Sequence, residues 1–263
     1  MSGQENLQIL YEDDHILVVY KEAGVAVQTK NYREKDLESM LRSYRAGKGE
    51  EPYIGVVHRL DQPVEGLVLF AKDAQSAAVL SAQINAKETK KQYCAMVEGI
   101  PPKKEETLVH YLAHDGKKNH TQAFQKPTDG AKRAELFYRV LKEDEKEQKA
   151  LLEITLKTGR PHQIRAQLAA IGHPLLGDQK YAGGRKNDEA NKSTVKERKT
   201  QDVDENVRHA SDIQQQLALC AYRLSFRHPV TKKQLSFQIK PQNPVFCTTE
   251  LDDNENVCDV CFL

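Results

Sequence analysis

Two short polar stretches hold the residues best suited to chemistry. The first, His58-Arg59-Leu60-Asp61, ends an apolar run, and Pro63 and Gly66 mark a turn before the next run. Loops held between strands often carry catalytic groups, and a carboxylate there can act as a nucleophile or a base. The structural alternative is that Asp61 caps backbone amides of the turn and Arg59 is simply exposed.

The second stretch, residues 156–165, passes from an apolar run through Gly159 to Pro161, which suits the first position of a helix. A helix over 161–171 would bury the face formed by Ile164, Leu168 and Ile171. Arg165 would then point across the edge of this helix. If that edge lies against the Asp61 loop, the guanidinium can hold the carboxylate ionised by charge pairing and a bidentate hydrogen bond. The alternative is a helix start with scattered polar residues.

A third stretch lies between them in the sequence. Alternation over Gln92–Glu98 places Tyr93, Ala95 and Val97 on one face of a strand. A tyrosine in such a position is commonly a core residue. The functional alternative is a ring that stacks on a nucleic-acid base while its hydroxyl reaches a polar group.

These stretches need a scaffold, and apolar patterning predicts one. Helical spacing is clearest over Ala74–Ala86, after the candidate N-cap Asp73, and over 161–171, before Gly172. The last two predicted strands flank a connection short enough for an antiparallel hairpin. We therefore expect an α+β fold, with a single domain on a largely antiparallel mixed sheet and flanking helices and loops. The predicted strands are His15–Tyr20, Ile54–Leu60, Gly66–Ala71, Gln92–Glu98, Ala134–Val140, Leu151–Leu156, Leu217–Phe226 and Gln234–Ile239.

Charge is unevenly distributed along the 263 residues, which hold 39 Lys and Arg against 38 Asp and Glu. Residues 245–263 contain five acidic and no basic side chains, so we expect an acidic C-terminal tail after a catalytic domain over 9–244. The remaining basic excess permits an anionic partner without requiring one. Residues 184–212 are almost all polar and predict a polar, flexible insertion, and residues 143–149 predict a solvated turn.

Several protein classes are excluded or disfavoured. The longest apolar runs are too short to span a bilayer, which argues against a membrane protein. The N-terminus has no signal-peptide pattern, so we expect a cytoplasmic protein with reduced cysteines. Cys258 and Cys261 have metal-ligand spacing, but a single pair at a terminus is better explained as a reduced chain end. No metal site is expected.

The polar stretches occur together with neighbours that point to one enzyme family. With these motifs in this order, the chain resembles the RluA-type pseudouridine synthases over residues 9–241. The motifs are His58–Asp61 with Gly66–Lys72, Lys91–Tyr93 through Gly99, Thr158–Arg165 with Gly172–Asp178 and Tyr181, and Leu219–Ala221 to Phe226–Pro229.

The resemblance implies an enzyme that needs no cofactor and converts uridine in ribosomal or transfer RNA to pseudouridine. Asp61 would be the essential carboxylate, acting either at the sugar C1′ or by deprotonation at C2′. Arg165 would keep it ionised. Tyr93 would stack on the detached uracil and help to move the C5 proton.

The resemblance also implies how RNA is held. Arg59 would fill the gap left by a uridine that is turned out of its stack. The resemblance further implies that the protein acts as a monomer. Many relatives carry a small RNA-binding domain before the catalytic one; here we expect the catalytic body alone to recognise RNA. The implied RNA contacts are Arg59, Arg160, His162, Lys91 and Lys157.

One loop departs from the family pattern. Relatives usually read Asp-Arg-x-Thr-Ser-Gly, whereas this chain has Asp61-Gln62-Pro63-Val64-Glu65-Gly66. A nearby Glu65 would oppose ionisation of Asp61, an effect that Arg165 should outweigh. Two alternatives follow from this loop. The first is a glycosidase that uses Asp61 and Glu65, and the second is a catalytically impaired family member that acts in RNA binding or ribosome assembly.

Overall fold

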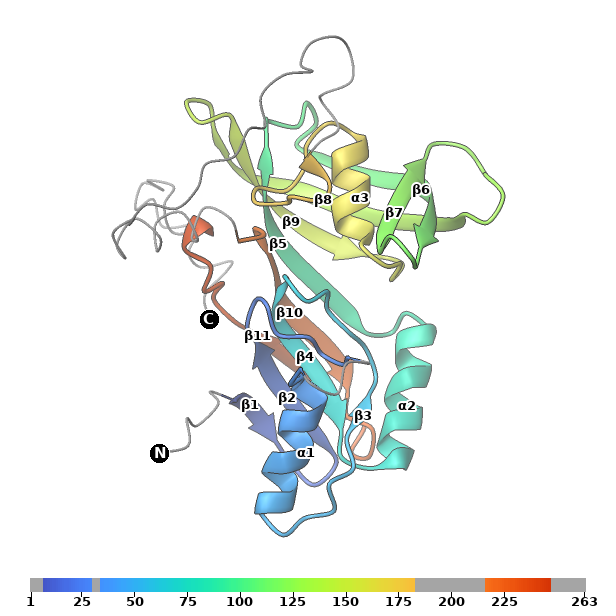
Figure 1. Cartoon of the computed structure of the whole chain (residues 1–263), viewed down its shortest axis with the longest axis vertical. Helices are drawn as coiled ribbons and strands as arrows, with labels where there is room; N and C mark the ends of the chain where they lie inside the picture. The colour runs from blue at the N-terminus through green and yellow to red at the C-terminus, as the bar shows by residue number, and fades with distance from the viewer. Residues whose placement is uncertain (1–6, 30–33, 183–215, 247–263) are drawn as a thin grey trace, which may run out of the picture.

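The computed structural model describes residues 7–29, 34–182 and 216–246 of the chain, and these form one mixed sheet with three α-helices against it (Figure 1). The strands are β1 (Gln8–Glu12), β2 (Ile16–Lys21), β3 (Gly55–Val56), β4 (Glu65–Ala71), β5 (Lys90–Glu98), β6 (Glu105–Asp115), β7 (His120–Phe124), β8 (Lys132–Asp144), β9 (Lys149–Leu156), β10 (Leu219–Arg227) and β11 (Gln234–Gln238). The helices are α1 (Leu37–Gly47), α2 (Ala74–Asn85) and α3 (Gln163–Ala170), and a short 3₁₀ turn, Pro244–Phe246, follows β11.

The sheet runs through the whole length of the molecule in the order β1-β2-β4-β10-β5-β9-β8-β6-β7, with β11 also paired to β10 and β3 to β4. Its pairings are antiparallel except that between β4 and β10. This confirms the predicted α+β fold on a largely antiparallel mixed sheet. The predicted hairpin is β10–β11.

The parallel contact between β4 and β10 depends on Gly66. Its φ of +130° is unfavourable for other residues, and a Cβ there would lie 2.5 Å from the carbonyl oxygen of Ala221 on β10. Because β4 directly follows the Asp61 loop, this close approach fixes the loop against the middle of the sheet.

The alternating pattern of β5 is confirmed. Tyr93, Ala95 and Val97 pack in the main hydrophobic core, whereas Cys94 and Met96 pack on the opposite face. Both faces of the central sheet are therefore buried. Cys94 and Cys220 are buried, and neither forms a disulfide bond among the described residues.

Two predicted boundaries were wrong. The strand predicted over Ile54–Leu60 pairs only at β3, because the remainder runs into the Asp61 loop. The helix predicted from Pro161 begins at Gln163, because His162, at φ +51°, is the N-cap.

The predicted apolar face of this helix is confirmed, since Ile164 and Leu168 are in the core and Ile171 packs against it. Gly172, with φ +84°, follows the C-cap as predicted.

Four elements had no counterpart in the sequence prediction: α1, β1, β6 and β7. In α1 the buried stripe is Leu37, Leu41 and Arg45, so a charged residue occupies one core-facing position. In β6 the buried alternate positions include His110. Polar residues at buried positions hid the periodicity of both elements.

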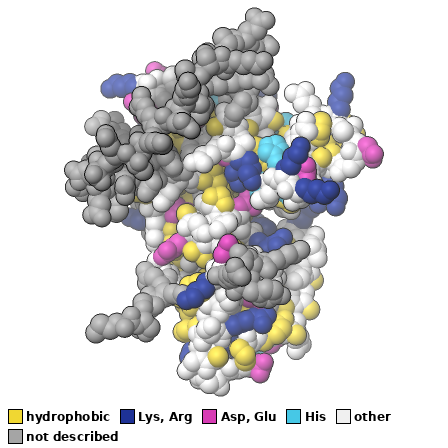
Figure 2. Space-filling view, in the orientation of Figure 1, with side chains coloured by type: hydrophobic (Ala, Val, Ile, Leu, Met, Phe, Trp, Pro, Cys, Tyr) yellow, Lys and Arg dark blue, Asp and Glu magenta, His cyan; other side chains and the backbone are white. Residues whose placement is uncertain are grey.

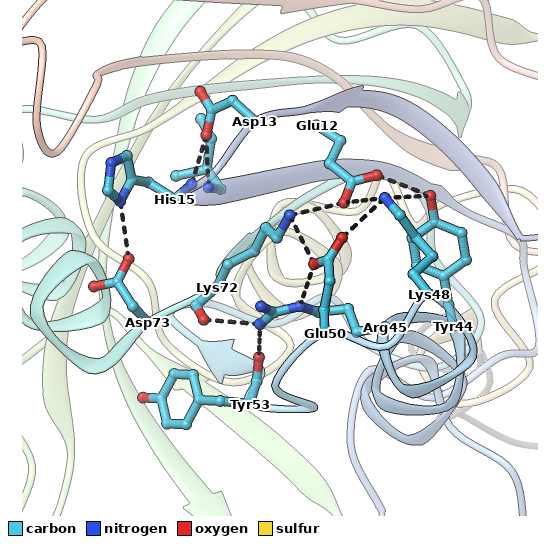
Figure 3. Close-up of polar contacts among 11 residues, drawn as sticks. Glu12, Asp13, His15, Tyr44, Arg45, Lys48, Glu50, Tyr53, Lys72 and Asp73 are labelled. Carbon is cyan, nitrogen blue, oxygen red and sulfur yellow. Dashed lines mark hydrogen bonds and ion pairs between the residues drawn. The ribbon is translucent and has the colours of Figure 1, made fainter.

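A network of ion pairs joins α1 to β1 and to the end of β4 (Figure 3). The Lys72 ammonium lies 2.8 Å from Glu12 and 3.1 Å from Glu50, and Lys48 lies 3.1 Å from each of the same two carboxylates. Arg45 contacts Glu50 and donates to the Tyr53 and Lys72 carbonyls at 2.5 and 2.8 Å. Hydrogen bonds from Lys48, Lys72 and Arg45 lower the pKa of Glu50 to about 2.

Some predictions lie outside the described residues. These are the polar insertion over 184–212, nearly all of the acidic tail over 245–263, and the Cys258 and Cys261 pair. The turn predicted over 143–149 is present, since β8 ends at Asp144 and β9 begins at Lys149. In the described part of the chain, no helix combines the length and apolar character needed to cross a membrane.

Candidate active site

A cleft of about 1150 Å³ opens where the two halves of the sheet meet. It is lined by the Asp61 loop, the start of β5, the end of β9 and the start of α3, which come from distant parts of the sequence. Figure 2 shows basic side chains and a histidine near the middle of the molecule, between its upper and lower parts. All eight candidate site residues line this cleft: Arg59, Asp61, Lys91, Tyr93, Lys157, Arg160, His162 and Arg165.

Asp61 is accessible from the cleft, since 30% of its side chain is exposed. Its Oδ2 lies 3.8 Å from Nη1 of Arg165 and 3.8 Å from Nε2 of His162. The loop around it is closed by the backbone hydrogen bond from Val64 to the Asp61 carbonyl oxygen. The carboxylate therefore borders the cleft, with both nitrogens nearest to the same oxygen, Oδ2.

Arg165 is buried and pairs with Asp61 as predicted, but its bidentate partner is a different carboxylate. Nε and Nη2 each donate to Asp178 at 2.8 Å, which leaves Nη1 for Asp61. Burial opposes the charged guanidinium, but the hydrogen bonds and charge of Asp178, together with the charge of Asp61, raise the pKa of Arg165. The sequence prediction was thus wrong about the bidentate bond, because Asp178 lies closer along the Nε edge.

His162 occupies a place unlike that of a surface RNA contact. It is buried, and its Nδ1 lies 2.8 Å from the Tyr181 hydroxyl while Nε2 faces Asp61. Burial and the nearby Arg165 charge lower the pKa of His162, although Asp61 opposes the shift. The neutral imidazole is therefore favoured beside the carboxylate.

Tyr93 lies in the wall of the cleft and is 6% exposed. Burial and the charge of Asp61 raise its pKa, so the phenol stays protonated at neutral pH. This position agrees with both interpretations of Tyr93, as a core residue and as a base-stacking ring, because the residue packs in the core and also borders the cleft.

The four remaining candidates line the same cleft as Asp61 and differ in exposure. Arg59 and Lys157 are exposed, and Arg160 is half-buried with its Nε bonded to the Arg133 carbonyl at 3.2 Å. Lys91 is half-buried, and burial lowers its pKa. All four nevertheless border the cleft.

The Gln62–Glu65 segment departs from the family pattern, and its side chains form contacts within the protein. Gln62 donates to the Gly24 carbonyl at 2.9 Å, and Val64 is buried in the core. Glu65 is buried, bonds to the Tyr20 hydroxyl and accepts the backbone N–H groups of residues 242 and 243 at 3.2 Å. Glu65 does not line the cleft, so it forms no catalytic carboxylate pair with Asp61.

Lys21 was missed by the sequence analysis. It is fully buried at the end of β2, and Nζ donates to the carbonyls of Glu22, Val25 and Gln62 at 2.9, 2.7 and 3.0 Å. Burial lowers the pKa of Lys21 to about 8, against the opposing charges of Asp61 and Glu65. The signal available in the sequence was a lysine at the end of an otherwise apolar strand, where burial of a charge would need nearby partners.

His58 belongs to the Asp61 loop and also lines the cleft. Its Nε2 accepts the Leu69 N–H at 3.0 Å, and burial lowers its pKa to about 3, so the ring is neutral. The buried Nδ1 has no hydrogen-bond partner among the described residues.

Comparisons with known proteins agree with this architecture. Residues 15–170 match the family model of RNA pseudouridylate synthase. The chain is 35% identical over 181 residues to the uncharacterized RNA pseudouridine synthase YhcT of Bacillus subtilis, covering 68% of this chain and 59% of that protein. It is 33% identical over 247 residues to ribosomal large subunit pseudouridine synthase D of Zymomonas mobilis, covering 90% and 70%. The chain thus spans about 59% to 70% of the length of these relatives.

Solved structures share the fold. Human RNA Pseudouridylate Synthase Domain Containing 1 superposes with a TM-score of 0.66 at 20% identity, covering 92% of this chain and 86% of that one. Human RNA Pseudouridylate Synthase Domain Containing 4 gives 0.63 at 21%, covering 89% of both. The motif order, the shared fold and the family match lead to one conclusion: this chain belongs to the RNA pseudouridylate synthase family.

Proposed function

We propose that this protein is an RNA pseudouridine synthase, an isomerase that converts specific uridines in RNA to pseudouridine. The observation that carries the proposal is the placement of Asp61 in an open cleft against Arg165, with Tyr93 in the same wall. An arginine partner suits a carboxylate that must be ionised to react. Family membership supplies the reaction class.

In the proposed reaction, the N1–C1′ bond of the uridine breaks, the uracil turns while bound, and a C5–C1′ bond forms. The proton at C5 is then lost and N1 gains one, so the product is an isomer of the substrate. Asp61 assists the first step in one of two ways. By attack at C1′ it forms an ester bond that breaks when the C5–C1′ bond forms, or it takes a proton from C2′ and returns it there when the C5–C1′ bond forms. No bound cofactor is part of this scheme.

Arg165 keeps the reacting carboxylate oriented, because Asp178 holds the opposite edge of the guanidinium. A donor fixed in this way needs no reorganisation when charge develops in the cleft. Tyr93 offers a ring face on which the uracil can stack, and its protonated hydroxyl can take part in the proton transfer at C5.

RNA would be held by the basic residues around the cleft. A paired uridine must leave its stack to reach Asp61, at a cost of a few kcal/mol. The exposed Arg59, two residues before Asp61, is placed to fill the vacated position, and Lys157 and Arg160 to contact phosphates. Because curated relatives are named for the large ribosomal subunit, its RNA is the first substrate to test. We propose that the protein works as a monomer in the cytoplasm.

The test is pseudouridine mapping by carbodiimide labelling and primer extension on RNA from the source cell. The gene would be deleted and then restored as wild type, as Asp61→Asn or as Asp14→Asn. Asp14 is exposed and outside the cleft, which makes it the matched control. We expect a site that disappears on deletion and returns with wild type and Asp14→Asn.

Asp61→Asn should not restore that site, although its protein is present at the wild-type level. A site restored equally by Asp61→Asn would remove Asp61 from the chemistry. If no uridine in ribosomal or transfer RNA changes on deletion, the proposed activity is wrong, and a role in RNA binding alone becomes the better explanation.

A further inference from the structure

His162 has an unusual backbone for a buried side chain. It lies in the left-handed region, at φ +51° and ψ +26°, where glycine and asparagine are favoured. It is the N-cap of α3, yet its side chain makes no capping hydrogen bond. Non-glycine residues held in this region concentrate at functional sites, where surrounding contacts over-determine them.

Contacts on the Tyr181 side define the orientation of the imidazole. The hydroxyl of Tyr181 accepts the N–H of Thr121 at 2.8 Å and lies 2.8 Å from Nδ1 of His162. A phenol has a single hydrogen to donate. Thr121 engages one lone pair of this oxygen, and we assign the hydroxyl hydrogen to the contact with Nδ1, so that Nδ1 accepts.

The position of the proton on the imidazole of His162 follows from this assignment. A neutral ring that accepts at Nδ1 carries its proton on Nε2. Nε2 is the nitrogen that lies 3.8 Å from Oδ2 of Asp61. The ring thus presents an N–H to the carboxylate.

Thr121 secures this arrangement from the neighbouring hairpin. Its hydroxyl donates to the Pro161 carbonyl at 2.9 Å and lies 2.9 Å from Nδ1 of His114, whose ring packs edge-on against His162 at 5.7 Å. The β6–β7 hairpin is therefore bonded directly to the turn that precedes His162. Rotation of the imidazole would break contacts on both sides.

Two donors then converge on one oxygen of Asp61. Nη1 of Arg165 and Nε2 of His162 are each 3.8 Å from Oδ2. Catalytic hydrogen bonds are often long before substrate binds and shorten in the complex. With both donors at Oδ2, the other oxygen, Oδ1, is left to face the substrate.

We propose that His162, oriented by the Tyr181 hydroxyl, is a positioning residue that donates from Nε2 to Oδ2 of Asp61 and so directs Oδ1 to the reacting sugar. This inference rests on the proposed function and deepens it. It assigns His162 to the carboxylate, whereas the sequence resemblance implied an RNA contact.

The experiment uses the full chain, purified, and an RNA containing the mapped uridine labelled with tritium at C5. Release of tritium under single-turnover conditions measures the rate of reaction, and titration of the same RNA gives Kd. His162→Asn keeps a residue suited to the left-handed region but is too short to reach Asp61. His162→Gln restores a side-chain N–H near the position of Nε2, and Tyr181→Phe removes only the hydroxyl.

We expect His162→Asn to lower the single-turnover rate by roughly 10- to 100-fold, as removal of orienting partners commonly does. RNA Kd should stay within about twofold, because His162 is only 8% exposed and offers RNA little surface. His162→Gln should recover most of the rate, and Tyr181→Phe should lose about 10-fold. Melting temperatures are recorded throughout, since Tyr181→Phe leaves the Thr121 N–H without its acceptor.

His173→Gln is the matched control, because His173 bonds to the Glu98 carbonyl outside the cleft. Its rate should equal that of wild type. A wild-type rate in His162→Asn would overturn the inference. So would equal losses in His162→Asn and His162→Gln, or a loss that appears in RNA Kd instead of the rate. Wild-type protein that releases no more tritium than Asp61→Asn would overturn the proposed function itself, and this inference with it.

Discussion

Asp61 lies beside an arginine that cannot move freely. Asp178, whose side chain is fully buried, takes both Nε and Nη2 of Arg165 and also accepts the backbone N–H groups of Lys180 and Tyr181. One carboxylate therefore holds the guanidinium so that the other can face the cleft. Preorganised donors of this kind depend on the residues behind them as much as on those that touch substrate.

Asp178→Asn tests that dependence. The change leaves the buried guanidinium with only the more distant Asp61 as counter-ion, so the free energy of unfolding should fall by about 3 kcal/mol, and the single-turnover rate should fall because Nη1 is no longer held. Urea denaturation and single-turnover assays measure the two effects. Glu135→Gln, in the exposed pair with Arg133, should change stability by less than about 1 kcal/mol. Equal losses in both variants would contradict the argument.

Glu65 replaces a hydroxyl residue of the family pattern, so its hydrogen bond to Tyr20 can be tested for a contribution to stability. Burial and the carboxylate raise the pKa of Tyr20, whose hydroxyl bonds to Glu65. A double-mutant cycle with Tyr20→Phe and Glu65→Gln should give a coupling of about 1–2 kcal/mol in urea denaturation. The exposed Ser225 and Ser236 pair, each changed to Ala, should couple by less than about 0.5 kcal/mol. Additive losses at Tyr20 and Glu65 would mean that the bond contributes nothing.

At the scale of elements, α1 is attached to the sheet by charge as well as by apolar packing. Leu37 and Leu41 enter the main core, while Arg45, Lys48 and the strand-end residue Lys72 converge on two carboxylates (Figure 3). Such a network favours one placement of the helix, because each cation has more than one partner. It also makes the attachment sensitive to acid.

The network predicts the pH dependence of stability. The pKa of Glu50 is about 2 in the folded protein against an ordinary value of 4.5, and Glu12 is also lowered. Carboxylates with lowered pKa stabilise the fold above their unfolded pKa and lose that effect as pH falls, so stability should decline between about pH 4.5 and 2. Urea denaturation across this range should show a flatter decline for Glu50→Gln.

The matched control for this profile is Glu147→Gln, on the exposed turn between β8 and β9. It should leave the profile unchanged. A wild-type curve already flat from pH 4.5 to 2, or one equally steep in Glu50→Gln, would show that the network does not control acid stability.

At the scale of the whole molecule, the cleft lies between two halves of a single sheet. The lower part in Figure 1 holds β1–β4 with α1 and α2, the upper part holds β6–β9 with α3, and β5 and β10 pass between them. Chemistry at the cleft therefore needs both halves. Asp61 comes from one half, whereas Arg165 and His162 come from the other.

The distribution of basic residues predicts how RNA binding responds to salt. Each phosphate contact releases counter-ions, so Lys157→Ala should reduce the slope of log Kd against log salt by about 0.7–1. Lys146→Ala, on the exposed turn between β8 and β9, should leave the slope unchanged. Filter binding from 50 mM to 200 mM salt measures both. The cleft would not be the RNA path if Lys146→Ala changed the slope and Lys157→Ala did not.

Much of the fold follows from local sequence pattern. Apolar patterning predicted β4, β5, β9 and β10, alternation predicted the core face of β5, and the Asp73 cap predicted the start of α2. Periodicity failed where a polar side chain occupies a core position, as Arg45 does in α1 and His110 in β6. His110 bonds to Gln167, and Arg45 bonds in part to the Lys72 carbonyl, and neither of these partners lies in the local window from which periodicity is judged.

The sequence by itself determined the family, the α+β class and eight of the residues that line the cleft, because motif order and apolar patterning are properties of the chain alone. Only the tertiary structure decided how those residues are paired. Asp178, and not Asp61, takes the bidentate bond of Arg165, and Glu65 turns away from the cleft. The reason is physical: these pairings depend on distances between atoms of separate strands and helices, which spacing along one strand or helix does not specify.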